Sequence, residues 1–144
     1  VFKRITDMNQ SGNHEAIRNE KDPFRAISLF LEFRTQFIIK YYNILEFLKN
    51  FNPRQIPVEL QPIFSNLQKR ELKTLTTIIE KGVEAGLFKI DDVKAVAELF
   101  FDMLDGFRQK SLSKVNFFPE KKQFQSVLKR EKEFAAIFFK GLTK

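Results

Sequence analysis

The chain has 144 residues, of which 43% are hydrophobic and 30% are charged, and its formal net charge is +7. This length suits one domain with a single substantial core. The absence of cysteine excludes disulfides and thiolate metal sites, and no apolar run approaches the about 20 residues of a membrane span. Basic residues form no run of five or more, so we do not expect this chain itself to bind DNA. No signal-peptide pattern opens it, as expected of a cytoplasmic protein.

Phenylalanine supplies nearly all of the aromatic content, with 18 Phe against two Tyr and no Trp. One interpretation is a core filled with phenylalanine, because each ring buries about 150–250 Å². The other is that some of the rings line a hollow for an apolar or aromatic ligand. The composition is compatible with both interpretations.

Residues 1–9 are expected to form the end of a helix that enters from upstream. Ser11, Gly12 and Asn13 then interrupt it, and a short helical piece can follow over 14–19. Asp22-Pro23 predicts the start of a long helix, since a capping side chain precedes proline at the first helical position. No Gly or Pro follows until residue 50, and the apolar arc is so wide that we expect this to be the central helix.

The next two helices are predicted over residues 62–85 and 92–114. Gly86 can take the left-handed conformation that closes a helix, and Leu87 and Phe88 are placed to fold back on its last turn. Asp91 or Asp92 is expected to cap the following helix. Gly82 is interpreted as a point of close helix approach.

Residues 115–119 are predicted to form a loop and 120–142 the last helix. In the 92–114 helix, Met103 is assigned to the main apolar stripe while Leu99 and Phe101 lie on its flank. This helix and the last one carry apolar residues beyond one stripe, and Gly106 interrupts the first of them. Surplus apolar surface of this kind is typical of an interface, so both helices are expected to pack inward and against a second copy.

Catalytic and metal-binding patterns are not found. His14 is the single histidine and lies in a polar stretch, so we expect it at the surface and expect no zinc or di-iron site. Glu98, Asp102 and Asp105 are interpreted as a solvated or inter-subunit edge rather than an acid/base pair, which requires a polar cleft. The sequence therefore predicts neither an enzyme nor a cofactor.

The stretch from Ile78 to Phe88, the aspartates Asp91-Asp92 and the later Leu104-Asp105-Gly106-Phe107 together resemble the regulatory domain of TetR-family transcription repressors. That family often shows Ile-x-x-Gly-x-x-x-Gly-x-Phe before the equivalent helix and an apolar-x-Gly-apolar step within it. Asp22-Pro23 at the start of a long helix is also similar to the family.

The resemblance implies an all-α, TetR-like C-terminal regulatory domain of about five to six helices, whose last two form a dimeric four-helix bundle. Residues 1–20 would be the end of a connector helix and a loop, preceded by a DNA-binding helix-turn-helix, and residues 21–144 would bind ligand and dimerise. The implied function is that of a ligand-responsive repressor, with an apolar or aromatic effector and operator DNA bound only through the upstream domain.

The pocket implied by the resemblance lies among the helices at 23–50, 62–85 and 92–114. Its expected lining is the aromatic and apolar surface that these helices turn toward one another: Phe30, Phe33, Phe37, Tyr41, Leu75, Ile79, Phe100 and Leu104. The expected dimer interface comes from the last two helices: Phe101, Gly106, Arg108, Phe134, Ala135 and Phe138. The alternatives are a helical interaction or dimerisation module without a small-molecule ligand and, from a third class, a carboxylate enzyme.

Overall fold

The computed structural model describes residues 15–51, 61–112 and 121–143. Within these ranges it gives the backbone alone at 41–51, 61–64, 108–109 and 111–112. The helix end expected at 1–9, the interruption at 11–13, His14 and the loop at 115–119 lie outside the described residues.

Four long helices follow a short helical segment at residues 15–19. They are α2 (Pro23–Phe51), α3 (Gln61–Glu84), α4 (Val93–Leu112) and α5 (Lys121–Lys140). Each bound lies within two residues of its predicted position, and the predicted all-α class is confirmed. Among the described residues no helix is long and apolar enough to cross a membrane.

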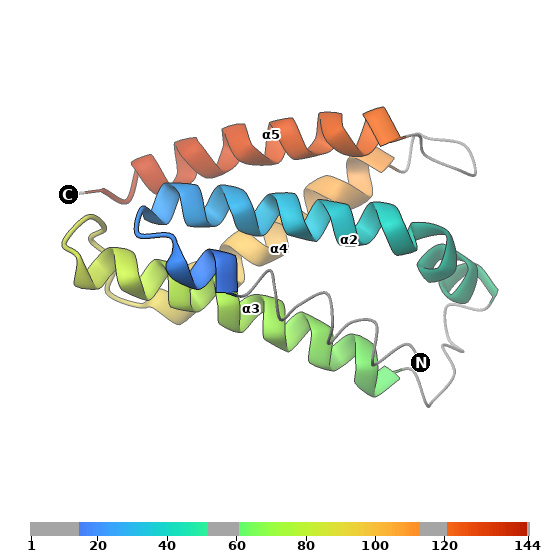
Figure 1. Ribbon diagram of the computed structural model, residues 1–144, viewed down its shortest axis with the longest axis horizontal. Coiled ribbons are helices and arrows are strands. Elements are labelled where there is room, and N and C mark those ends of the chain that lie inside the picture. The colour runs from blue at the N-terminus through green and yellow to red at the C-terminus, as the bar shows by residue number, and fades with distance from the viewer. Residues whose placement is uncertain (1–14, 52–60, 113–120, 144) are drawn as a thin grey trace.

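The four helices surround a common interior in the order α2, α5, α4, α3. Figure 1 shows α2 in front with α5 and α3 on its two sides, while α4 crosses behind it. Consequently α2 and α4 lie on one diagonal of the bundle, and α3 and α5 lie on the other. Side chains of α2 such as Arg34 meet α4 across this interior.

Two aspartates cap helices as the sequence predicts. Asp22 Oδ1 accepts a hydrogen bond from the Phe24 backbone N–H at 3.0 Å, at the start of α2. Asp92 Oδ1 accepts one from the Ala95 N–H at 3.1 Å, at the start of α4. Both bonds satisfy amide hydrogens that the first helical turn leaves without a partner.

The turn after α3 is built on Gly86 and Phe88. Gly86 has φ of 77°, which favours glycine, and Phe88 folds back so that its ring is buried. Leu87 does not fold back and is exposed. Gly82 was expected to mark the close approach of another helix, and this is wrong. The close neighbour is the ring of Phe88 in the following turn, which would lie 2.3 Å from a Cβ at residue 82. A hydrogen bond joins this turn to the C-terminal end of the described chain: the Lys89 N–H donates to the Leu142 carbonyl at 2.8 Å.

Replacing Gly82 by alanine is expected to destabilise the fold by about 1–2 kcal/mol. The new methyl overpacks a ring held by Phe24 and Phe139, a cost of about 1–3 kcal/mol, which outweighs the gain of up to about 1 kcal/mol in helix propensity. Gly106→Ala is the control for the protomer, since nothing in the described part of the chain lies within 4 Å of its added Cβ, and it should stabilise α4 at concentrations where the protein is monomeric. Urea unfolding of both variants measures the contrast; an equal gain in stability from both would contradict it.

The hydrophobic core falls into two clusters along the bundle. The larger one lies toward the α3–α4 turn and contains Phe30, Leu75, Phe100 and Phe139 among others. The smaller one has Phe124 and Val127 at its centre and draws Ile38, Ile39 and Phe107 against it. On α2 the change from one cluster to the other occurs at Arg34 and Thr35, both of which are buried.

Candidate functional site

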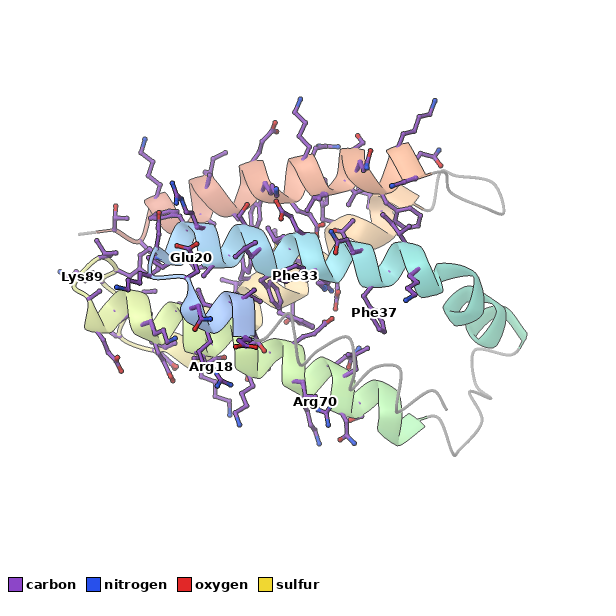
Figure 2. The ribbon with its side chains drawn as sticks, in the orientation of Figure 1. Arg18, Glu20, Phe33, Phe37, Arg70 and Lys89 are labelled. Carbon is purple, nitrogen blue, oxygen red and sulfur yellow. The ribbon has the colours of Figure 1, made fainter. Side chains whose placement is uncertain are left out.

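The predicted pocket residues are largely brought together. Buried members of the larger cluster are Phe30, Leu75, Ile79, Phe100 and Leu104, and Phe33 packs against its edge. Phe37 is half-buried, and Figure 2 shows it projecting from α2 on the side of α3. Tyr41 lies on α2, but its side chain is outside the described residues.

Around Phe100 the rings pack directly on one another. Its centroid lies 4.9 Å from that of Phe139, 5.3 Å from Phe138 and 5.7 Å from Phe134, the last in a stacked arrangement. These spacings are the usual ones for aromatic pairs in a core. Phe100 therefore belongs to a filled aromatic core, whereas Phe33 and Phe37 at the α2–α3 side are partly open.

Two hollows lie elsewhere on the described surface. A groove of about 150 Å³ runs between α2 and α5 and is lined by Phe24, Leu31, Ala136 and Phe139, with Lys132 at its side. A smaller hollow of about 50 Å³ lies where the 15–19 segment meets α2 and α3. None of the predicted pocket residues lines either hollow.

A cluster of charged residues lies between the two apolar clusters, and we refer to it as the Arg34 hub: Arg34, Glu71, Asp105 and Glu131. Arg34 of α2 meets one carboxylate from each of the other three long helices. Its Nη2 bonds Asp105 Oδ1 of α4. Its Nε lies 3.4 Å from Glu71 Oε2 of α3, and its Nη1 lies 3.7 Å from Glu131 Oε2 of α5.

The hub is buried to different depths. The side chains of Arg34 and Glu131 are each 6% exposed, against 18% for Glu71 and 26% for Asp105. The Arg34 guanidinium also lies over the ring of Phe101, 5.0 Å from its centroid, where a cation is attracted to the ring face. Burial alone would lower the pKa of Arg34, yet the three surrounding carboxylates raise it above its ordinary value. The guanidinium therefore stays charged.

The hub was not predicted from the sequence, and it corrects one interpretation. Asp105 is half-buried and bonded to Arg34 inside the protomer, so it does not belong to the solvated edge with which it was grouped. Glu98 and Asp102, the other two carboxylates of that group, are exposed. No group of His, Cys, Asp or Glu suited to holding a metal ion occurs among the described residues.

The residues predicted for the dimer interface divide by exposure. Phe101 and Ala135 are buried within the protomer, Phe134 and Phe138 are half-buried, and Gly106 is exposed. The side chain of Arg108 is outside the described residues. Phe134 and Phe138 lie against Phe100.

Three large apolar side chains outside the predicted list of interface residues are exposed on α4 and α5. Leu99 is 54% exposed, Met103 49% and Ile137 74%. Leu99 and Met103 are four residues apart and share one face of α4. We refer to these three residues as the outer α4/α5 face.

The helical bundle, its aromatic core and its exposed apolar residues on the last two helices define an all-α domain. A family model described as "QacR-like protein, C-terminal region" matches residues 39–144. The chain therefore belongs to the TetR family and carries its C-terminal regulatory domain, as the resemblance implied. Comparison with curated proteins and with solved structures gave no match.

Proposed function

We propose that this domain binds an apolar or aromatic small molecule and couples that binding to DNA binding by an upstream helix-turn-helix, in a cytoplasmic transcriptional repressor. The family match over residues 39–144 is the observation that carries the proposal. In such a protein the domain acts as a regulator and does no chemistry on its effector.

The effector site is proposed at the α2–α3 side, where Phe33 and Phe37 are only partly covered. The larger apolar cluster forms its floor through Ile79 and Leu75. Partly covered aromatic surface next to an apolar floor suits a ligand that is itself apolar and flat. The nearby hub carries more acidic than basic groups, which disfavours an acidic effector.

A thermal-shift screen with neutral, lipophilic aromatic compounds tests the proposal. A compound present at 100 times its dissociation constant stabilises the folded domain by about 2.7 kcal/mol, which raises the melting temperature by about 5–10 °C for a chain of this size. A matched panel of aromatic carboxylic acids should give smaller shifts. If no compound of either panel shifts the melting temperature, the domain has no such effector.

One observation favours the alternative of an interaction module without a ligand. Leu75, Ile79 and Phe100 are fully buried and packed, as in a core with no room for an effector. Under this alternative the outer α4/α5 face would be the functional surface, and the screen would return nothing while dimerisation persists.

Homodimerisation is proposed through the outer α4/α5 face together with Gly106, Phe134 and Phe138. Large apolar side chains are exposed on both α4 and α5, which pack on each other, and such surface is typical of a face covered by a partner. Gly106 adds a position where nothing within the described protomer lies against an added Cβ, so a second helix can approach closely there.

Met103→Glu is expected to raise the dimer dissociation constant by at least about tenfold, or 1.4 kcal/mol, because the interface would then contain a desolvated carboxylate. Sedimentation at micromolar concentration should show wild-type protein as a dimer of two 17.0 kDa chains. Leu87→Glu is the control, since Leu87 is similarly exposed but lies on the α3–α4 turn. Wild-type protein that sediments only as a monomer would contradict the dimer.

A further inference from the structure

The guanidinium of Arg34 is shared unequally among three acceptors. Charge-assisted bonds between nitrogen and carboxylate oxygen are usually about 2.7–2.9 Å long. Only Asp105 is bonded closely, while Glu71 at 3.4 Å and Glu131 at 3.7 Å are beyond that length. Arg34 Nε has no hydrogen-bond partner among the described residues, although it carries a donor. The hub is therefore an incompletely bonded network in which three carboxylates face three different nitrogens of one guanidinium, so that its position is a compromise among them.

The three acceptors belong to helices with different proposed roles. Glu71 lies on α3, one turn before Leu75 of the expected effector site. Glu131 lies on α5 and Asp105 on α4, the helices of the proposed dimer. A movement of α3 relative to α2 changes the distance from Arg34 to Glu71. The guanidinium then shifts, which changes its distances to Asp105 of α4 and Glu131 of α5.

Helix α3 packs directly on α2 and α4, so α5 is the long helix that α3 does not contact through its backbone. Because α3 and α5 lie on a diagonal, their backbones do not pack on each other. Arg34 contacts both from the interior, and it also reaches across the other diagonal to Asp105 of α4. A small shift can be transmitted in this way because a packed interior switches between discrete arrangements rather than deforming continuously.

We propose that Arg34 is a positioning residue that couples α3 to α4 and α5, so that a change at the effector side alters the helices of the dimer through the competition of three carboxylates for one guanidinium. The consequence for regulation rests on the proposed function. The coupling itself is a property of the folded domain and can be measured without an effector.

A purely structural role predicts something different. Buried ion pairs often add little stability compared with apolar residues of the same size, and loss of one partner would loosen the fold around the mutated side chain. Coupling predicts instead that loss of Glu71 frees the guanidinium for Glu131 and Asp105. Removal of a charge on α3 should then slow hydrogen exchange of the amides of α5, which lies diagonally opposite α3 in the bundle.

Hydrogen–deuterium exchange on the full chain tests this. In Glu71→Gln, amides of α5 around Glu131 should exchange about fivefold more slowly than in wild type, the lower end of typical coupling energies. Glu80→Gln is the control, because Glu80 is an exposed carboxylate on the same helix, and it should leave α5 unchanged. In an Arg34→Met background, Glu71→Gln should no longer affect α5.

Unchanged or faster exchange in α5 of Glu71→Gln overturns the proposal, as does an effect that persists without Arg34. A second measurement separates this from the proposed function. The neutral dye Nile red should change the wild-type dimer dissociation constant by about fivefold or more, and by less than about twofold in Glu71→Gln. Protection of α5 without any binding of Nile red would leave the hub coupling in place and count against the effector site.

Discussion

Arg34→Met is expected to lower the free energy of unfolding by about 3–5 kcal/mol, the usual effect of removing one partner from a buried charge cluster. Methionine replaces most of the apolar stem but takes the shared cation away from three carboxylates. Glu131 is the most affected, since its side chain is 6% exposed and the loss of a nearby cation is felt most by a buried charge. Phe101 also loses the cation above its ring.

Urea unfolding followed by circular dichroism measures this loss, and two further variants locate its cause. Arg25→Met removes an exposed arginine of the same helix, whose side chain is 77% exposed and lies 4.0 Å from Asp22; it should change stability by less than about 0.5 kcal/mol. Arg34→Lys keeps the charge but not the planar fork, so it should fall between the other two. A loss below about 1 kcal/mol in Arg34→Met would contradict the electrostatic role of the hub.

The contribution of Arg34 to the free energy of unfolding should not depend on pH between pH 6 and about 9. The pKa of Arg34 is raised above its already high ordinary value in the folded state. A cation with a raised pKa contributes stability that is fully present below its unfolded pKa and is lost only as pH rises through the folded value. Loss of stability between pH 6 and about 9 would therefore have to come from other groups.

The helical framework was predictable because its signals are local. Asp22 before Pro23, Gly86 at a left-handed position and Asp92 before α4 each fix a helix end through backbone chemistry, and each occupies its expected position. The residue that contacts Gly82, in contrast, could not be predicted from local sequence. Gly82 signalled a close contact, but only the folded turn identifies the ring of Phe88 as that contact.

The Arg34 hub was not predicted, because only Asp105 of its four residues was singled out, and it was grouped with Glu98 and Asp102 of its own helix. Arg34 lies three residues after Leu31 and four before Ile38, on the apolar stripe of α2. Glu131 occupies the same kind of position on the buried stripe of α5, four residues from Val127 and from Ala135. An arginine on one stripe and carboxylates on the facing stripes form a detectable pattern, but their meeting at one level depends on helix register, which the sequence does not reveal.

The orientation of α4 was predicted with an error of part of a turn. Met103 was assigned to the main stripe and Phe101 to its flank, whereas Met103 is 49% exposed and Phe101 is 8% exposed. Phe101 belongs to the larger apolar cluster, and Arg34 of α2 lies against its ring. A helix with apolar residues on most of its surface has no single face in its sequence, so its neighbours decide which side is buried.

Phe100→Ala is expected to cost about 3–5 kcal/mol of stability, which lowers the melting temperature by about 10 °C or more. Phe100 is fully buried, and its removal takes one ring contact from each of three neighbouring phenylalanines at once. Phe37→Ala should cost much less, because Phe37 is only half-buried at the side of α3.

The same two variants separate the two interpretations of the phenylalanines. If the effector binds at the partly open side of α2 and α3, Phe37→Ala should weaken binding of a compound found in the thermal-shift screen by about 1–2 kcal/mol, or roughly 5–30-fold, at little cost in stability. Phe100→Ala, measured below its melting temperature, should lose stability far more than affinity, because its ring is enclosed by Phe134, Phe138 and Phe139. Titration calorimetry with each variant supplies the affinities. Unchanged affinity in both variants would place the effector outside the predicted pocket, and the α2–α5 groove next to Phe24 and Phe139 would be the next site to test.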